Sequence, residues 1–158
     1  MTQERGVRLP LGLARTLLAA LADAVGVTDL PANGPLVPWA VRHAAWLHAH
    51  YVAGPDGKTP HLRLVGKPYR SPIAQFGEKV HYLGLGTLKE PGRDKGSSRW
   101  GEGHFLGIRN ETGEILIGNA EGVVKARDFK RIADPEQRWN AESFKKMRGS
   151  PGKPNPEV

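Results

Sequence analysis

The chain has 158 residues, of which 39% are hydrophobic and 25% are charged, a composition typical of soluble globular proteins rather than disordered ones. It contains no cysteine, which excludes disulfides and zinc sites with cysteine ligands. The formal net charge of +7 favours polyanionic partners.

The first predicted element is an amphipathic helix that ends at Val25. Pro10 either occupies its first turn or interrupts a longer helix that begins near Glu4. Arg15 and Asp23 interrupt the apolar stretch, so the helix is too short and too polar to span a membrane. We therefore expect an intracellular protein without a membrane partner. The apolar stripe repeats every four residues and consists of Leu13, Leu17, Leu21 and Val25.

A second helix is predicted over residues 38–52, and one of its faces consists of Trp39, His43, Trp46 and His50. Thr59 and Pro60 then match the N-cap and first residue of a short helix. His43 and His50 lie two helical turns apart, and no histidine pair has the spacing of a metal-binding motif. We expect these histidines to be helix-packing or surface residues rather than metal ligands.

Short apolar runs in the second half of the chain predict the strands of a small β-barrel. Turn residues at 110–113 and 119–122 predict hairpins, and the polar run 89–98 predicts an exposed loop. Gly101 and Gly103 are interpreted as turn or bulge glycines of a curved sheet. The predicted strands are Lys79–Leu85, His104–Arg109, Glu114–Gly118 and Gly122–Phe129.

Charge is distributed unevenly along the sequence. Residues 1–57 contain four basic and four acidic residues, whereas residues 58–158 contain 19 basic and 12 acidic residues and hold the whole excess of +7. Basic side chains on the strands of a small barrel, with aromatic rings nearby, suit the phosphate backbone of a nucleic acid. An ordinary solvated strand face is the alternative. We predict phosphate contacts from Lys79, Arg99, Arg109, Lys125, Arg127, Lys130 and Arg131.

Two other functions stay open at this point. Tyr82, Trp100 and Phe105 form an aromatic set that would line an exposed groove for a peptide, as small barrels of this kind often do. The third interpretation is the product of a decayed open reading frame that has kept no function.

Five segments of the chain follow one another in a recognisable order. They are Leu36–Tyr51, Asp56–Pro68, Phe76–Val80, Arg99–Gly107 and Val124–Phe129. Together they resemble the C-terminal part of the integrases of Copia-like retrotransposons. These integrases are parts of retrovirus-related Pol polyproteins. The resemblance covers about residues 4–132.

This resemblance implies that the first two helices are the end of an RNase H-like catalytic core, followed by an SH3-like barrel that contacts DNA. It places Glu4 at the position of the catalytic glutamate, as a vestige, while the two catalytic aspartates are missing. Because one carboxylate cannot hold two metal ions, we expect no strand transfer by this chain and no cofactor, with Mg²⁺ only in a complete integrase. DNA and other integrase chains are the expected partners, and the nucleus is the expected location.

The sequence therefore predicts an α+β chain in four parts. Residues 1–57 are the helical remnant of the catalytic core, and residues 58–76 are a linker with a short helix. Residues 77–132 form an SH3-like β-barrel of about five strands, and residues 133–158 form a basic, disordered tail. The expected function is that of a DNA-binding integrase fragment involved in DNA integration, which is not an enzyme on its own.

Overall fold

The computed structural model describes residues 2–26, 36–84, 100–151, 153 and 154, with side chains from residue 11 onward. It divides into two compact units, which we name the helical unit (Met1–Ile73) and the barrel unit (Ala74–Val158). Helices in the first unit and an antiparallel sheet in the second confirm the α+β class. The boundary after Ile73 lies inside the segment 58–76 that the sequence suggests is a linker.

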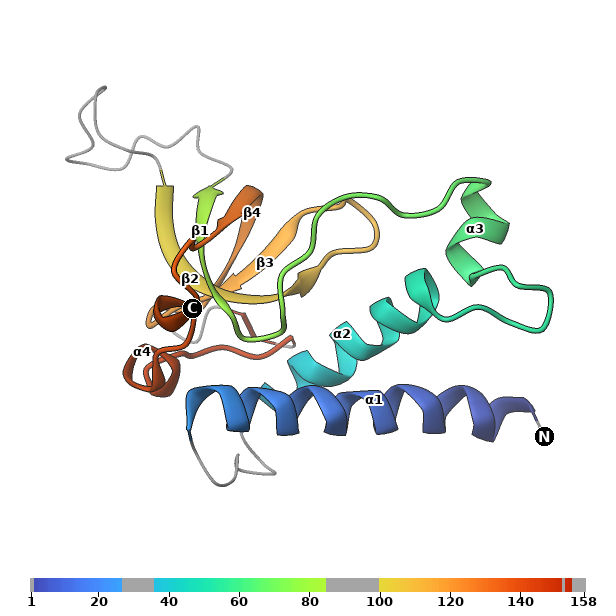
Figure 1. Ribbon diagram of the computed structural model, residues 1–158, viewed down its shortest axis with the longest axis horizontal. Coiled ribbons are helices and arrows are strands. Elements are labelled where there is room, and N and C mark those ends of the chain that lie inside the picture. The colour runs from blue at the N-terminus through green and yellow to red at the C-terminus, as the bar shows by residue number, and fades with distance from the viewer. Residues whose placement is uncertain (1, 27–35, 85–99, 152, 155–158) are drawn as a thin grey trace. The chain divides into compact units, whose positions relative to one another are not determined.

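Three helices make up the described part of the helical unit, and four strands followed by two short helices make up that of the barrel unit (Figure 1). The former are α1 (Thr2–Val25), α2 (Leu36–Tyr51) and α3 (Pro60–Val65). The latter are β1 (Lys79–Gly84), β2 (Trp100–Ile108), β3 (Ile115–Gly118), β4 (Val123–Arg131), the 3-10 helix η1 (Pro135–Arg138) and α4 (Ala141–Lys145).

In the helical unit, α1 and α2 pack against each other. The backbone of α1 continues through Pro10 as one helix, so Pro10 lies neither in its first turn nor at an interruption, and both predicted roles are wrong. Ala40 and Ala44 are fully buried, and such small side chains let two helices approach closely. The predicted ring face of α2 is buried along its whole length, which confirms it as the packing face: Trp39, His43, Trp46 and His50.

Short α3 has a cap at each end. The Thr59 hydroxyl accepts a hydrogen bond from the Leu62 amide at 3.1 Å, which confirms the predicted N-cap. Gly66 ends the helix with a φ of +79°, a left-handed conformation that favours glycine, and its amide donates to the Leu62 carbonyl at 2.8 Å. A helix of six residues is too short to be stable alone, so α3 depends on its contacts with the rest of the unit.

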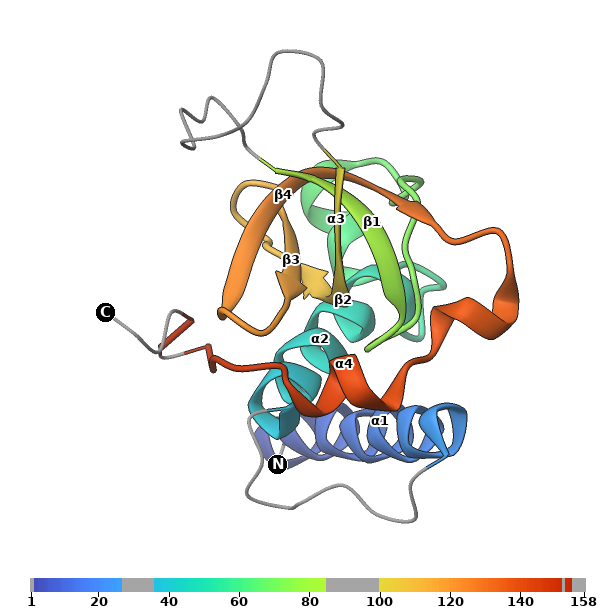
Figure 2. The same ribbon diagram turned by 90° about the vertical axis from the view of Figure 1, so that its left-hand side faces the viewer.

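The strands of the barrel unit form one antiparallel sheet in the order β1-β2-β3-β4, and β1 also pairs with β4, so that the sheet closes into a barrel (Figure 2). The described residues contain four strands, against the about five that the sequence predicts. Bulges interrupt the register at Leu83/Gly84 and between Phe105 and Gly107. Both predicted hairpin turns are present, with the Gly113 amide bonded to the Arg109 carbonyl and the Gly122 amide bonded to that of Asn119. Fully buried side chains fill the interior: Val80, Phe105, Ile117 and Ala126.

Gly101 and Gly103 lie within β2, not in a turn, and serve close packing. A Cβ atom on Gly101 would stand 2.9 Å from the ring of Tyr82, and one on Gly103 would collide with the side chain of Ile117. Their role is therefore to leave room for larger side chains inside a narrow barrel.

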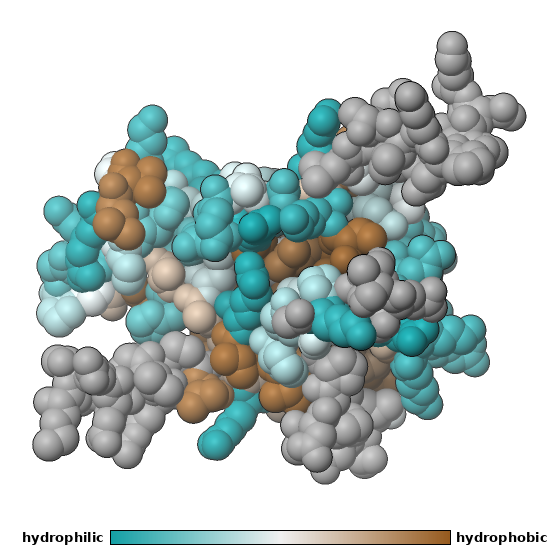
Figure 3. Space-filling view, turned by 180° about the vertical axis from the view of Figure 1, so that it is seen from behind, coloured by the Kyte–Doolittle hydropathy of each residue, from teal (hydrophilic) through white to brown (hydrophobic). Residues whose placement is uncertain are grey.

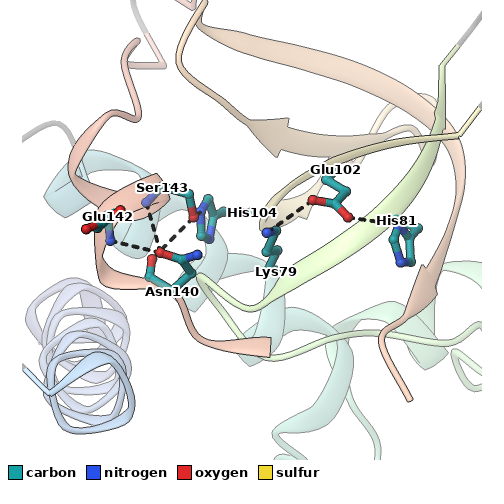
Figure 4. A network of polar contacts seen from close by, with 7 residues as sticks. All are labelled: Lys79, His81, Glu102, His104, Asn140, Glu142 and Ser143. Atoms are coloured by element: carbon teal, nitrogen blue, oxygen red, sulfur yellow. Dashed lines mark hydrogen bonds and ion pairs between the residues drawn. The ribbon is translucent and has the colours of Figure 1, made fainter. Parts of the chain in front are cut away.

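The segment predicted as a disordered tail, 133–158, forms η1 and α4 in its described part. Asn140 caps α4 by accepting hydrogen bonds from the amides of Glu142 and Ser143, at 3.0 and 3.2 Å (Figure 4). Phe144 and Met147 are both 7% exposed, and Met147 packs directly over Gly118 of β3. These two apolar residues, three apart on a helical turn, stand in a run of basic residues that makes the segment look like a solvated tail.

His104 of β2 holds α4 to the barrel. Its Nδ1 donates to the Gly77 carbonyl at 2.9 Å, so in the neutral ring Nε2 accepts the hydroxyl of Ser143, also at 2.9 Å (Figure 4). Burial lowers the pKa of His104 and keeps the ring in this neutral form.

A buried ion pair lies where β1 and β4 close the barrel. Glu78, which is 0% exposed, accepts hydrogen bonds from Arg131 Nε at 2.9 Å and Nη2 at 2.7 Å. The backbone carbonyl of Glu78 also accepts the Phe105 amide at 2.9 Å, so this residue connects three strands. A buried carboxylate without its cation is costly.

We predict that Arg131→Met lowers the free energy of unfolding by about 2–3 kcal/mol, less than for a fully enclosed pair because the Arg131 side chain is 42% exposed. Urea denaturation of the full chain measures this. Arg127→Met, at an exposed position of the same strand, is the control and should change stability by less than about 0.5 kcal/mol. Equal stability of the two variants would contradict a structural role for Arg131.

His43 is 2% exposed, and burial lowers its pKa from 6.5 to about 4. Above pH 6.5 the ring is neutral in both the folded and the unfolded chain, so burial of the His43 ring costs no deprotonation and the chain has its full stability there. Between pH 6.5 and about 4 only the unfolded chain takes up this proton, which removes about 3 kcal/mol of stability.

We predict that His43→Leu makes the free energy of unfolding less dependent on pH, by about 3 kcal/mol over that window. Denaturant titrations of both proteins at pH 7 and pH 4 provide the measurement. Parallel pH profiles would show that His43 does not titrate in this way.

Candidate nucleic-acid interface

The outward face of β1 and its two neighbours carries most of the predicted phosphate contacts. Val80 points into the barrel and is fully buried, so alternation places Lys79 and His81 outward. Strand register sets His81 between Glu102 of β2 and Lys130 of β4 as direct cross-strand neighbours. The face is thus a row of polar side chains across three strands.

Lys79 is partly neutralised on this face. Its Nζ lies 3.1 Å from a Glu102 oxygen, and its side chain is only 20% exposed. The other Glu102 oxygen lies 3.9 Å from Nδ1 of His81, so one carboxylate serves both cations when the histidine is protonated (Figure 4). Lys79 therefore offers less positive charge to a ligand than the sequence suggests.

Arg109 and Lys125 share an acidic neighbour at the end of the β2–β3 hairpin. Arg109 lies 3.3 Å from Glu111 and 3.8 Å from Glu114, and Lys125 Nζ lies 4.0 Å from Glu114. Partly exposed pairs of this kind are weak, but each carboxylate reduces the local positive potential.

Arg131 is engaged by the buried Glu78 through two nitrogens, and the geometry assigns it to barrel closure rather than to a phosphate contact. The bidentate pairing uses two of the five guanidinium N–H donors, and the Glu78 carboxylate neutralises the charge that would attract a phosphate.

Arg127 and Lys130 differ from the other predicted contacts. Leu83 pairs with Asp128 and Gly84 pairs with Ala126, so Arg127 is the extra residue of the bulge and its exposed side chain joins the outward face. Lys130 Nζ lies 4.6 Å above the ring of Trp100. Among the described residues, neither cation lies within ion-pair distance of a carboxylate.

Two predicted site residues fall outside what is described. Arg99 is not among the described residues, and Glu4 lies in α1 but its side chain is not described. Their assigned roles stay predictions.

The aromatic set proposed for peptide binding does not form an exposed groove. Phe105 is 0% exposed and packs on Phe129 with ring centroids 5.4 Å apart. Tyr82 is partly buried against Gly101. The three rings do not share one face of the sheet. Side chains alternate along a strand, so Phe105 and Tyr82 lie on the inner face and Trp100 lies on the outer one.

When the net charge is counted for each compact unit, the excess of positive charge is not confined to the barrel unit. Residues 74–158 contain 15 basic and 12 acidic residues, a net charge of +3, and residues 1–73 carry the remaining +4. Four basic residues and no acidic residue occur in 57–77, around α3. The sequence predicts this group in a linker, residues 58–76, and the predicted phosphate contacts all lie beyond it, so the segment was missed as a candidate. The group consists of Lys58, Arg63, Lys67 and Arg70.

Comparison of the chain with known protein families, with curated proteins and with solved structures finds no match. In the described ranges, no three His, Asp or Glu side chains gather as a metal site would require. None of the helices in the described part of the chain has the length and apolar character to cross a membrane.

Proposed function

We propose that the barrel unit binds the phosphate backbone of DNA through the outward face of β4, with Arg127 and Lys130 as its principal contacts. The observation that carries this proposal is the contrast within the basic set. Carboxylates lie within ion-pair distance of Lys79, Arg109, Lys125 and Arg131, whereas among the described residues none lies that close to Arg127 or Lys130. Uncompensated, exposed cations release the most free energy when they displace the counterions of DNA.

Trp100 supports this assignment in two ways. A lysine held over an indole ring gains about 0.5–1 kcal/mol at an exposed site, which keeps Lys130 on the outward face. An aromatic ring beside a phosphate-binding cation is also the arrangement with which proteins stack an unpaired base of a single strand.

The proposal extends to the origin of the chain. Two helices, a short capped helix and a small antiparallel barrel follow one another in the order that a resemblance to the end of a Copia-like integrase implies. In that interpretation the barrel is SH3-like, DNA and other integrase chains are its partners, and the protein works in the nucleus. Strand transfer needs several carboxylates around two metal ions, and the proposal assigns no reaction to this chain.

We predict that Arg127→Ala/Lys130→Ala weakens binding to duplex DNA and reduces the slope of log K against log salt concentration by about 2. Fluorescence anisotropy with a labelled duplex, over a salt series, measures both quantities. The matched comparison is Arg109→Ala/Lys125→Ala, which removes the same two charges from positions near Glu114. Its slope should change by less.

Equal losses in the two double variants would show that only total charge matters, and the outward face of β4 would lose its special role. Absence of a salt-dependent interaction in the wild-type protein would refute the function itself.

A further inference from the structure

We infer that the α3 segment, residues 58–70, is a second phosphate-binding surface, located on the helical unit. The inference rests on the proposed function in one respect, since it takes DNA as the ligand. It adds a site that belongs to another compact unit and that uses different residues.

Charge is the first observation. No acidic residue occurs in 57–77, and the nearest one before it, Asp56, is occupied by Arg63. Arg63 Nε lies 3.0 Å from Oδ2 and Nη2 lies 2.5 Å from Oδ1. Hydrogen bonds from the Arg63 guanidinium and from the Lys58 amide hold the pKa of Asp56 at about 2, so this pairing persists at any ordinary pH.

Three cations remain around the paired arginine: Lys58, Lys67 and Arg70. All three side chains are exposed. Within the described part of the chain, no carboxylate lies within ion-pair distance of any of them. They form the same kind of uncompensated group as Arg127 and Lys130 on the barrel.

The second observation is that the backbone carrying these cations is ordered before any ligand binds. The Gly54 amide donates to the Lys58 carbonyl at 2.9 Å, and the Lys58 amide donates to Asp56 Oδ1 at 3.1 Å. Caps then fix both ends of α3, between Lys58 and Lys67. A surface that is already ordered loses less conformational entropy on binding.

The third observation is a stack of rings that anchors this segment to α2. His50 lies 4.0 Å from Trp46 and 4.4 Å from His61 of α3, measured between ring centroids. The ring of Tyr69 meets Trp46 and His50 edge-on, at 4.9 and 5.2 Å. His50 Nδ1 donates to the Trp46 carbonyl at 2.7 Å, and burial lowers the pKa of His50, so the His50 ring is neutral at neutral pH.

These anchors alternate with the cations along the chain. His61 and Tyr69 point to α2, while Lys58, Lys67 and Arg70 are exposed around them. A helix of six residues is roughly 9 Å long, so Lys58 and Lys67 at its two ends are spaced to reach separate phosphates of one strand.

An anionic membrane surface is the competing ligand. Leu64 is 88% exposed and Val65 is 59% exposed, and Figure 3 shows apolar surface at the α3 end of the helical unit surrounded by hydrophilic residues. Membrane-bound helices, however, bury a long apolar face, and α3 offers two aliphatic side chains on six residues. The small apolar area and the excess of cations favour a phosphate backbone.

Two binding surfaces in one chain raise affinity through effective concentration, because the second contact becomes intramolecular once the first has formed. A single duplex long enough for both units should therefore bind more tightly than a short one, and removing either surface should abolish this advantage.

The test uses the full chain and a long labelled duplex in the same salt series. We expect Lys67→Ala/Arg70→Ala to reduce the salt slope by about 2, in addition to the loss caused by Arg127→Ala/Lys130→Ala. The control is Arg15→Ala/Arg42→Ala, which removes two exposed charges from α1 and α2 of the same unit and should leave the slope closer to that of the wild type. Circular dichroism checks that each variant is folded.

The outcomes separate the two claims. A loss in the barrel variant with none in Lys67→Ala/Arg70→Ala overturns the α3 inference and leaves the proposed function intact. A loss in the α3 variant with none in the barrel variant overturns the proposed function of β4 and leaves the α3 surface as a DNA-binding site. Phosphatidylserine vesicles are the second probe: vesicle binding that needs Leu64, tested with Leu64→Ser, together with unchanged DNA binding in the α3 variant, would replace DNA by a membrane as the ligand.

Discussion

Pairing of β1 with β4 is the constraint on which the barrel unit depends, because it converts a four-stranded sheet into a closed one. Closure brings the first and last strands together and fixes the Glu78–Arg131 pair between them. The same pairing contains the bulge that adds Arg127 to the outward face, and it sets Lys130 beside Trp100. Stability and the candidate interface therefore arise from one structural feature.

The positions of the carboxylates determine which cations of the barrel face have no acidic neighbour and can contact a phosphate. A basic strand face looks uniform in the sequence, but the fold brings an acid to most of its members and pairs the half-exposed Arg131 with a buried carboxylate. Of the predicted contacts that the structure describes, only Arg127 and Lys130 have no carboxylate within ion-pair distance. Lys58, Lys67 and Arg70 around α3 share that property. Under the proposed function, one DNA duplex contacts both groups.

Much of the local structure follows from the sequence. Hairpin turns, the capped α3 and the ring face of α2 depend on near neighbours, and Thr59 or the residue pattern of the helix suffices to predict them. Features that depend on distant partners were not predictable in this way. The buried Glu78, the inward turn of Phe105 and the packing of Met147 on Gly118 arise from strands or helices far apart in the sequence. The charge on α3 was visible in the sequence, but the segment was assigned to a linker and none of its residues was among the predicted contacts.

The most direct measurement of the central claim is a titration of the ¹⁵N-labelled full chain with a short DNA duplex at low salt, followed through amide chemical shifts. Phosphate contacts at the two uncompensated groups predict the largest shifts around Arg127 and Lys130 and along residues 58–70, and these shifts should fade as salt is added. Shifts that are absent, or that gather at the acid-paired hairpin around Arg109 and Glu114, would contradict the account.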